Sequence, residues 1–256
     1  MKDILLLETV DSTNRVARDL GTAGKPHGYA VVAGSQLHGR GRLGKAWQSP
    51  PGKGLYATIL LRPCLEVKEY SKITLTAGLA LSQVLEEVCQ LDVALKWPND
   101  IYISGRKCGG ILVETSSLQG EADGHFALVG IGVNVNTEKE AFLPDLRKSA
   151  TSLFLESGKE YEILSLFEAI RSRLLQLIFQ LAHEGFTDIL NKWRERDMLQ
   201  GKWTQWLTPT GEVIYGESLG VDNNGILSVR DRSGKIHEVL SGDVSLTPQL
   251  GGREII

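Results

Sequence analysis

The chain has 256 residues, of which 42% are hydrophobic, so it is long enough for one full core and a small second domain. Its net charge of −3 excludes a general nucleic-acid binder, because such proteins carry a broad basic surface. The three cysteines and the lack of a long apolar segment exclude a disulfide framework and a membrane span, and they indicate a reduced, cytoplasmic protein.

The first predicted elements are a short strand and a helix. The apolar run Ile4–Leu7 predicts the strand. The helix follows over residues 15–21, with Gly21 as its C′ residue. Ser12 or Thr13 is expected to cap this helix. A helix N-terminus with hydroxyls and the amide of Asn14 is also a site for a small polar ligand, and the local sequence leaves both interpretations open.

A second strand at residues 29–33 leads to Gln36 and then to the segment Gly39–Trp47. Gln36 is either a hydrogen-bonding partner for a ligand amide or a surface residue. His38 is expected to be exposed. The segment itself contains three glycines, two arginines, a lysine and a tryptophan, which together suit a loop around a small anionic ligand that carries a ring.

The glycines of this segment match the dinucleotide fingerprint G-x-G-x-x-G. That fingerprint requires a helix to open on the glycines, but Pro50 and Pro51 follow closely, and no helix interior tolerates them. The segment is therefore a glycine–arginine loop, and its simplest alternative is a solvated basic turn.

A strand at residues 55–61 and a long, deeply packed helix at residues 68–89 come next. Two short strands then flank the tetrapeptide Trp97–Asp100, in which Asp100 could hold a hard cation such as Mg²⁺ or could simply form a turn with Asn99. Lys107 stands before paired glycines and can reach a phosphate or an acyl oxygen as a point charge.

The remaining elements predicted before residue 200 are a strand at residues 111–115, a turn at 120–124, a strand at 125–136 and helices at 162–183 and 186–196. Asn134 could pair with an adenine edge or be an edge-strand asparagine. After residue 200 the sequence pattern changes to short predicted strands between glycine- and asparagine-rich turns, and this pattern predicts a small barrel. The expected domains are residues 1–200 and 201–256.

Five motifs occur in the order found in biotin protein ligases, and the chain resembles that family over essentially its whole length. The motifs are Asp11-Ser12-Thr13-Asn14, Gly39-Arg40-Gly41-Arg42 through Trp47, Lys96-Trp97-Pro98-Asn99-Asp100, Lys107 with Gly110-Ile111-Leu112-Val113-Glu114, and Gly130-Ile131-Gly132-Val133-Asn134. The resemblance implies an α+β fold: a mixed β-sheet flanked by helices, related to class II aminoacyl-tRNA synthetases, with a C-terminal SH3-like barrel.

The resemblance also implies a reaction in two steps. Biotin and MgATP would give biotinoyl-5′-AMP and pyrophosphate, and a lysine of a biotin carboxyl carrier domain would then accept the biotinoyl group. The residues implied to act in catalysis are Lys107, Arg40 and Arg42. Those implied to bind biotin are Ser12, Thr13, Asn14, Gln36, Gly39, Arg40, Gly41, Arg42, Lys107 and Gly110. Those implied to bind ATP or the adenylate are Arg42, Lys45, Trp47, Lys96, Asn99, Lys107 and Asn134, and Asp100 is the candidate for Mg²⁺.

Two features depart from what is common in the family. Lys45 stands where an arginine is frequent, so the charge is kept but the bidentate fork is lost. The ligase motifs begin within the first dozen residues, so we expect a monofunctional ligase without a DNA-binding domain. A homodimer is common in the family. The competing interpretations are a lipoate or octanoate ligase or transferase of the same fold, and a non-catalytic regulator that binds biotin or a nucleotide.

Overall fold

The computed structural model describes residues 3–117, 125–208, 211–239 and 243–246. The chain divides into two compact units, Met1–Arg196 and Asp197–Ile256, so the division falls just before the predicted one at residue 200. The turn predicted at residues 120–124 and the last ten residues of the expected C-terminal domain lie outside the described residues.

A seven-stranded mixed sheet forms the centre of the first unit, in the order β1-β2-β3-β7-β6-β5-β4. Only β1 and β2 run parallel; the other neighbours are antiparallel. The strands are β1 (Ile4–Val10), β2 (Ala30–Gln36), β3 (Gly54–Leu61), β4 (Val93–Lys96), β5 (Asp100–Ile103), β6 (Arg106–Ser117) and β7 (His125–Asn134). This arrangement confirms the predicted mixed sheet.

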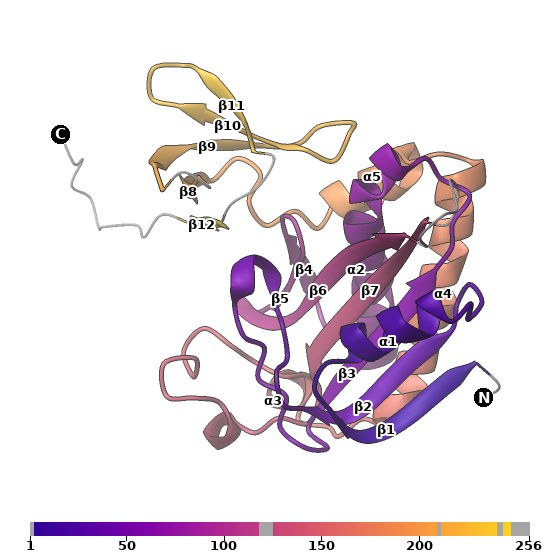
Figure 1. The fold of residues 1–256 in the computed structure, drawn as a ribbon. Coiled ribbons are helices and arrows are strands. Elements are labelled where there is room, and N and C mark those ends of the chain that lie inside the picture. Colours follow the sequence, from indigo (N-terminus) through magenta and orange to yellow (C-terminus); the bar gives the residue numbers. More distant parts are fainter. Residues whose placement is uncertain (1–2, 118–124, 209–210, 240–242, 247–256) are drawn as a thin grey trace. The chain divides into compact units, whose positions relative to one another are not determined.

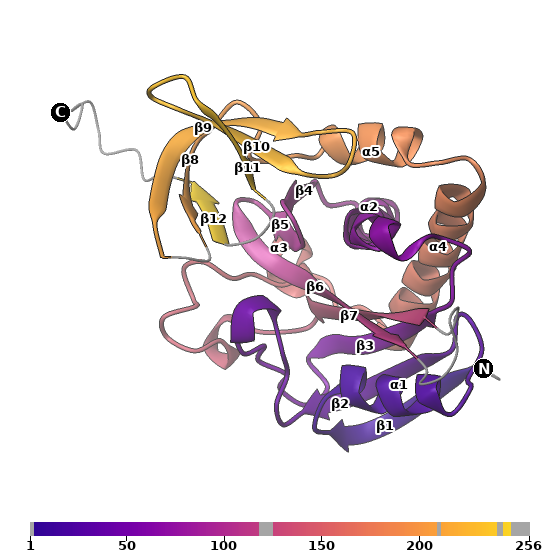
Figure 2. The same cartoon turned by 45° about the horizontal axis from the view of Figure 1, so that its top comes forward.

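Helices cover both faces of this sheet, as Figures 1 and 2 show. Helix α1 (Thr13–Thr22) lies on one face, and α2 (Ser71–Cys89) and α4 (Ile163–His183) lie on the other. The short helices α3 (Leu153–Ser157) and α5 (Thr187–Arg194) and the 3₁₀ turns η1 (Arg42–Gly44), η2 (Val67–Glu69) and η3 (Lys139–Ala141) complete the unit. Among these, α3 and the 3₁₀ turns were not predicted.

Helix α1 ends later than predicted. Gly21 lies inside the helix, Ala23 is the C-cap, and Gly24 takes the positive φ of 84°. Gly21 is required instead for packing, because a Cβ there would lie 2.5 Å from the ring of Phe126. Ala17, Val31, Leu60, Phe126 and Leu128 form the buried cluster beneath this helix.

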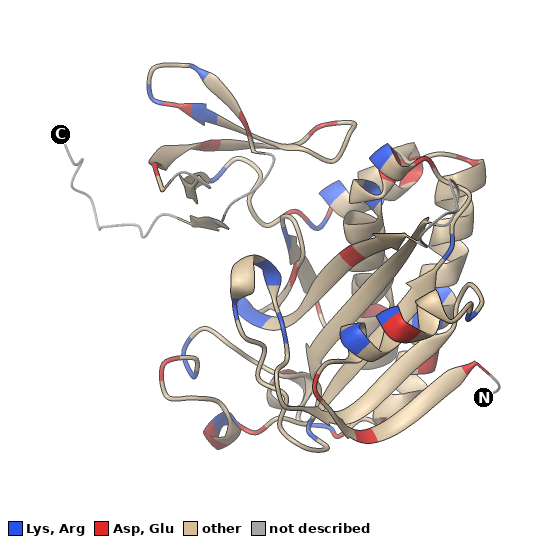
Figure 3. Ribbon diagram, viewed as in Figure 1, with Lys and Arg blue, Asp and Glu red and all other residues tan. Residues whose placement is uncertain are grey.

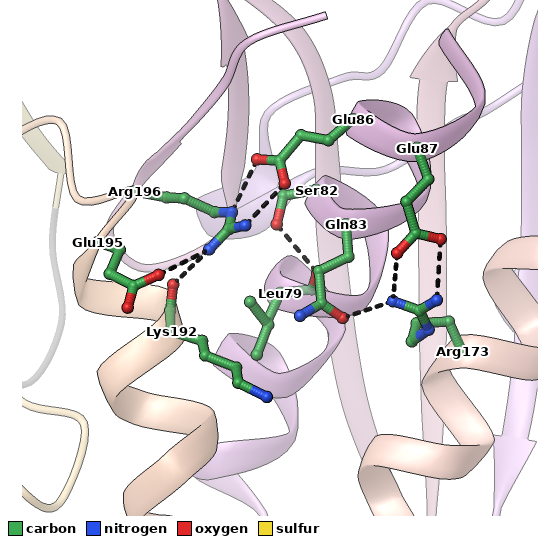
Figure 4. A network of polar contacts seen from close by, with 9 residues as sticks. All are labelled: Leu79, Ser82, Gln83, Glu86, Glu87, Arg173, Lys192, Glu195 and Arg196. Carbon is green, nitrogen blue, oxygen red and sulfur yellow. Dashed lines mark hydrogen bonds and ion pairs between the residues drawn. The ribbon is translucent and has the colours of Figure 1, made fainter. Parts of the chain in front are cut away.

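Ion pairs join the helices on the opposite face, as Figure 4 shows. Arg173 of α4 forms a bidentate contact with Glu87 of α2 at 2.9 and 3.0 Å. Arg196 makes an equivalent pair with Glu86 at 2.7 Å, and its carbonyl accepts the N–H of Leu95 on the edge strand β4. These contacts fix the end of the first unit to α2 and to the sheet edge.

The second unit is a five-stranded antiparallel sheet in the order β11-β10-β9-β8-β12. Its strands are β8 (Trp203–Leu207), β9 (Val213–Val221), β10 (Leu227–Asp231), β11 (Ile236–Val239) and β12 (Asp243–Leu246). The core contains Trp206, Val221, Leu227 and Val229. A small all-β domain was predicted here, although β12 was not. Within the described part of the chain, no helix combines the length and apolar character needed to cross a membrane.

Candidate active site

The register of the large sheet places the motif residues on the face that α1 covers. Tyr56 pairs with Gly132, Gly132 with Gly110 and Gly110 with Asp100, so these four residues form one row across β3, β7, β6 and β5. Directly opposite residues of neighbouring strands point to the same face of a sheet. The next row on this face contains Thr58, Gly130 and Leu112, and the one after it contains Leu60, Leu128 and Glu114.

Glycines in these rows make room for two side chains of the motifs. A Cβ on Gly132 would lie 2.7 Å from the indole of Trp47, and one on Gly130 would lie 2.4 Å from Oδ1 of Asn14. Both distances are too short for a real contact. The strand glycines therefore let Trp47 and Asn14 approach the backbone.

The segment Gly39–Trp47 forms a hairpin. Trp47 N donates to the carbonyl of Gly39 at 2.9 Å, and Gly41 N donates to that of Lys45 at 2.7 Å. The turn at its tip is η1, where Leu43 has a φ of 54°. Gly39 permits the close approach, because a Cβ there would lie 2.4 Å from the Trp47 carbonyl oxygen.

A chain of polar contacts runs beneath this hairpin. Gln36 donates to Ser49 Oγ at 3.0 Å and accepts from both the backbone N–H and the hydroxyl of Thr13. Gln36, rather than the Ser12 hydroxyl, therefore satisfies the first N–H of α1.

The contacts continue through the buried Thr58. Its hydroxyl lies 2.9 Å from Thr13 Oγ1 and donates to Asn14 Oδ1 at 2.6 Å. Asn14 in turn donates to Glu114 at 2.7 Å. The predicted biotin-contact residues of α1 are thus tied to each other through strand β3.

Each cation with a predicted catalytic role has a partner in the protein. Lys107 Nζ lies 2.6 Å from Asp100 Oδ1, and Arg40 Nη2 lies 3.1 Å from Glu114 Oε2. Arg42 Nη1 donates to Asn99 Oδ1 at 3.4 Å. These partners orient the three positive charges.

Backbone contacts also fix two of these residues. Lys107 bonds through its N–H and C=O to Ser149 and Thr151. The backbone carbonyl of Asn99 accepts the N–H of Ile111, and the side-chain amide of Asn99 donates to the carbonyl of Ile111. Lys107 also lies 5.7 Å from the centre of the Trp47 ring.

A pocket of about 610 Å³ lies between the hairpin and strand β6, a volume typical of small-molecule sites. Figure 3 shows the basic residues gathered on the hairpin beside it. The pocket lining consists of Leu37, His38, Gly39, Arg40, Gly41, Arg42, Leu43, Gly44, Lys45, Ala46, Trp47, Leu112, Val113 and Glu114.

The other predicted site residues have different surroundings. Lys96 pairs with Asp100 in the β4–β5 register, so it extends the glycine row to the sheet edge. Asn134 is buried, and its amide nitrogen donates to the carbonyl of Thr151 at 2.9 Å. Lys45 lines the pocket, whereas Ser12 is buried at the start of α1.

His38 is exposed, as predicted, and anchors the hairpin to the N-terminus of α1. Its ring Nδ1 pairs with the carboxylate of Asp11, and its backbone N–H donates to the Asp11 carbonyl. The hydrogen bond from His38, together with the charge of Arg15, holds the pKa of Asp11 below its usual value.

Glu114, Arg18 and Thr58 belong to this site but had no predicted role. Glu114 accepts from Asn14, Arg18 and Arg40, and Arg18 contributes its guanidinium at 3.2 Å. A charge or a hydroxyl at alternate positions of otherwise apolar strands is the sequence signal that points to Glu114 and Thr58. Arg18 lies one helical turn after Asn14 and so shares its face.

The arrangement combines positive charge, a stacking surface and a polar pocket floor, and it offers no activated nucleophile. Cys108 is fully buried, and burial raises the pKa of its thiol. Such a site suits a reaction that joins two bound substrates, one of them anionic, by positioning and charge neutralisation.

Comparison with known proteins identifies the family. Residues 6–134 match the biotin/lipoate A/B protein ligase family. The chain belongs to this family. Residues 206–247 match the biotin protein ligase C-terminal domain, which identifies the second unit as the predicted SH3-like domain.

Known members of this ligase family match nearly the whole length of the chain. The biotin–[acetyl-CoA-carboxylase] ligase of Paracoccus denitrificans is 32% identical over 90% of this chain and 95% of its own. The bifunctional ligase/repressor BirA of Bacillus spizizenii is 32% identical over 95% of this chain and 74% of its own length. These findings confirm the predicted activity, that of a biotin protein ligase.

A solved structure gives the same result. The biotin protein ligase from Aquifex aeolicus, in complex with biotin and ATP, matches with a TM-score of 0.80 and 30% identity, covering 96% of this chain and 99% of that one. The predicted α+β ligase fold is therefore confirmed. The individual roles of the site residues stay predictions.

Proposed function

We propose that this ligase activates biotin with ATP and then transfers it to a lysine of a biotin carboxyl carrier domain. The observation that carries the proposal is the pocket between the hairpin and β6, where Arg40, Arg42 and Trp47 meet the strand that bears Lys107. Full-length likeness to biotin protein ligases supports the choice of substrate.

In the first step, a carboxylate oxygen of biotin attacks the α-phosphorus of ATP. A new P–O bond forms, the bond to the bridging oxygen breaks, and pyrophosphate leaves with its electron pair. Lys107 and Arg42 would neutralise the charge that concentrates on the phosphate oxygens. Arg40 would hold the biotin carboxylate or the phosphate.

In the second step, the uncharged amine of the acceptor lysine attacks the acyl carbon of biotinoyl-5′-AMP. The C–N bond forms, the acyl C–O bond breaks, the amine loses a proton to solvent, and AMP leaves. The protein again supplies position and charge rather than a covalent intermediate.

The biotin head would lie near the α1 N-terminus, where Thr13, Asn14 and Gln36 present polar groups and Ser12 is adjacent. Trp47 would stack on the adenine. Its indole Nε1 is buried and has no hydrogen-bond partner among the described residues. Lys45, Lys96, Asn99 and Asn134 would complete the nucleotide site.

The residues present are compatible with Mg²⁺ bound together with ATP. No cluster of three histidine, cysteine or carboxylate side chains occurs among the described residues. Mg²⁺ commonly takes only one or two carboxylates and completes its shell with substrate phosphates and water. Asp100 would supply that carboxylate, and the ion would neutralise phosphate charge.

The acceptor would be a biotin carboxyl carrier protein, as the name of the Paracoccus denitrificans relative suggests. The three free cysteines are compatible with the cytoplasmic location that we propose. The absence of DNA binding and the formation of a homodimer stay predictions.

The test is pyrophosphate release from the protein mixed with biotin, ATP and Mg²⁺, with lipoate as the parallel substrate. We expect release with biotin only. Release with lipoate alone would assign the chain to the lipoate branch of its family. Tight biotin binding without release would favour a regulator.

A further inference from the structure

Glu114 is a charged residue on an otherwise apolar stretch of β6, and it lies on the face that carries the site. Its side chain is only 22% exposed. A carboxylate in such a position is expected to be held by several donors.

The donors come from two separate elements. Asn14 and Arg18 belong to α1 and reach Oε2 and Oε1 at 2.7 and 3.2 Å. Arg40 belongs to the hairpin and reaches Oε2 at 3.1 Å. The carboxylate of Glu114 on β6 therefore links two elements. One is α1, which would bind the biotin head, and the other is the hairpin, which would close over the biotin.

The contact leaves Arg40 able to bind an anion. A guanidinium has five N–H donors, and the contact with Glu114 uses Nη2 alone. The Arg40 side chain is 43% exposed and lines the pocket. Glu114 thus orients the guanidinium without occupying it.

Glu114 also closes the chain of polar contacts beneath the hairpin. That chain begins at Ser49, just after the hairpin, and passes through Gln36, Thr13, Thr58 and Asn14. It ends on Glu114 and returns to the hairpin at Arg40. Both ends of the hairpin are therefore tied to the same residues of α1.

We propose that Glu114 is a positioning residue of the ligase, which acts by holding Arg40 over the pocket in register with Asn14. The proposal rests on the proposed function, because Glu114 would hold Arg40 in the position from which its guanidinium contacts biotin and the developing acyl phosphate. In this role Glu114 acts through Arg40 and not on the reacting atoms.

The decisive variant is Glu114→Gln, which keeps an acceptor for Asn14 but removes the charge that holds Arg40 and Arg18. We expect kcat/KM for biotin-dependent pyrophosphate release to fall about tenfold, the effect of losing a charge-assisted hydrogen bond. Glu87→Gln is the matched control, because it breaks an arginine–carboxylate pair on the opposite face of the sheet. The control should keep full activity.

A double-mutant cycle with Arg40→Gln separates positioning from a general loss of structure. If Glu114 acts through Arg40, Glu114→Gln will change kcat/KM less than about twofold in the Arg40→Gln background. A tenfold effect that persists there would overturn the proposal. A rise in kcat/KM for Glu114→Gln would also overturn it, because Glu114 would then be a competitor of the substrate.

Hydrogen exchange in the hairpin provides a readout that needs no substrate. Glu114→Gln should speed exchange at Gly41 and Trp47, whose N–H groups close the hairpin, and Glu87→Gln should not. Unchanged exchange in Glu114→Gln would contradict the proposal. If the wild type fails to release pyrophosphate, the proposed function fails, while this measurement still decides whether Glu114 holds the hairpin.

Discussion

The indole of Trp47 lies directly against Gly132. A Cβ on that glycine would lie 2.7 Å from both Cε2 and Nε1 of the ring. Because the ring contacts backbone atoms of the central strand β7, moving that strand away would break hydrogen bonds of the sheet. The position of the predicted adenine-stacking residue therefore depends on the absence of a side chain at residue 132.

We expect Gly132→Ala to displace Trp47 and to raise the KM for ATP about tenfold, since stacking on an aromatic side chain is worth about 1–3 kcal/mol per base. Steady-state kinetics with varied ATP measure the effect. Gly78→Ala is the control, because a Cβ there meets its nearest atom at an ordinary 3.5 Å. An unchanged KM in Gly132→Ala would remove Trp47 from the nucleotide site.

The sequence predicts much of this fold because its apolar periodicity and turn residues are local signals. Most of the strands, the long helices and the C-terminal β-domain follow from them, whereas the mixed sheet was implied by the resemblance to biotin protein ligases. The predicted end of α1 was wrong because of a tertiary contact. Gly21 marked a plausible C′ position, but it lies inside the helix, and its lack of a Cβ makes room for the ring of Phe126. A glycine required for packing looks the same in sequence as one that ends a helix.

The candidate site shows the same limit. The resemblance names the cations, and these residues do gather on one face. It does not say which partner each cation has, because Arg40 and Glu114 are 74 residues apart and meet only in the folded sheet, where β3 and β7 lie between β2 and β6. Thr58 is buried in an apolar strand, and only the folded sheet places it between Thr13 and Asn14.

Lys107 lies 2.6 Å from Asp100 and close to the Trp47 ring, so its charge faces the predicted nucleotide site. We expect Lys107→Ala to slow adenylate formation about 100-fold, the cost of one preorganised charge in a transition state. Single-turnover pyrophosphate release measures the rate. Lys72→Ala, which breaks a 2.9 Å lysine–glutamate pair away from the site, should be neutral. Wild-type adenylation in Lys107→Ala would exclude its proposed role.

Acid should weaken the C-terminal domain through Asp231. Its carboxylate pairs with His237 at 2.7 Å and accepts from Ser233 and Lys235. The His237 hydrogen bond, followed by that from Ser233, lowers the pKa of Asp231 below its ordinary 3.8. Between the folded and unfolded pKa values, the unfolded chain binds more protons. The stabilisation is therefore complete above about pH 4 and declines as the pH falls through the folded value.

Urea unfolding at pH 7, 4 and 3, followed by tryptophan fluorescence, measures this dependence. Asp231→Asn should lower stability at pH 7 and flatten the decline in acid, because the group no longer titrates. Asp222→Asn is the matched control, since Asp222 caps a similar turn through the N–H groups of Asn224 and Ile226. An equally steep acid decline in Asp231→Asn would assign the dependence to other groups.

Thr58 is the buried link between Thr13 and Asn14, and valine has nearly its shape without the hydroxyl. Thr58→Val would leave Asn14 Oδ1 without its donor at 2.6 Å and would remove a contact of Thr13 Oγ1. We expect the free energy of unfolding to fall by about 1–3 kcal/mol, the usual cost of an unsatisfied buried polar group. Because both residues belong to the proposed biotin pocket, biotin affinity should fall in parallel. Thr76→Val removes only a bond to the Lys72 carbonyl within α2 and should leave biotin affinity unchanged. Titration calorimetry with biotin compares the two variants, and equal affinities would show that the polar chain beneath the hairpin does not shape the pocket.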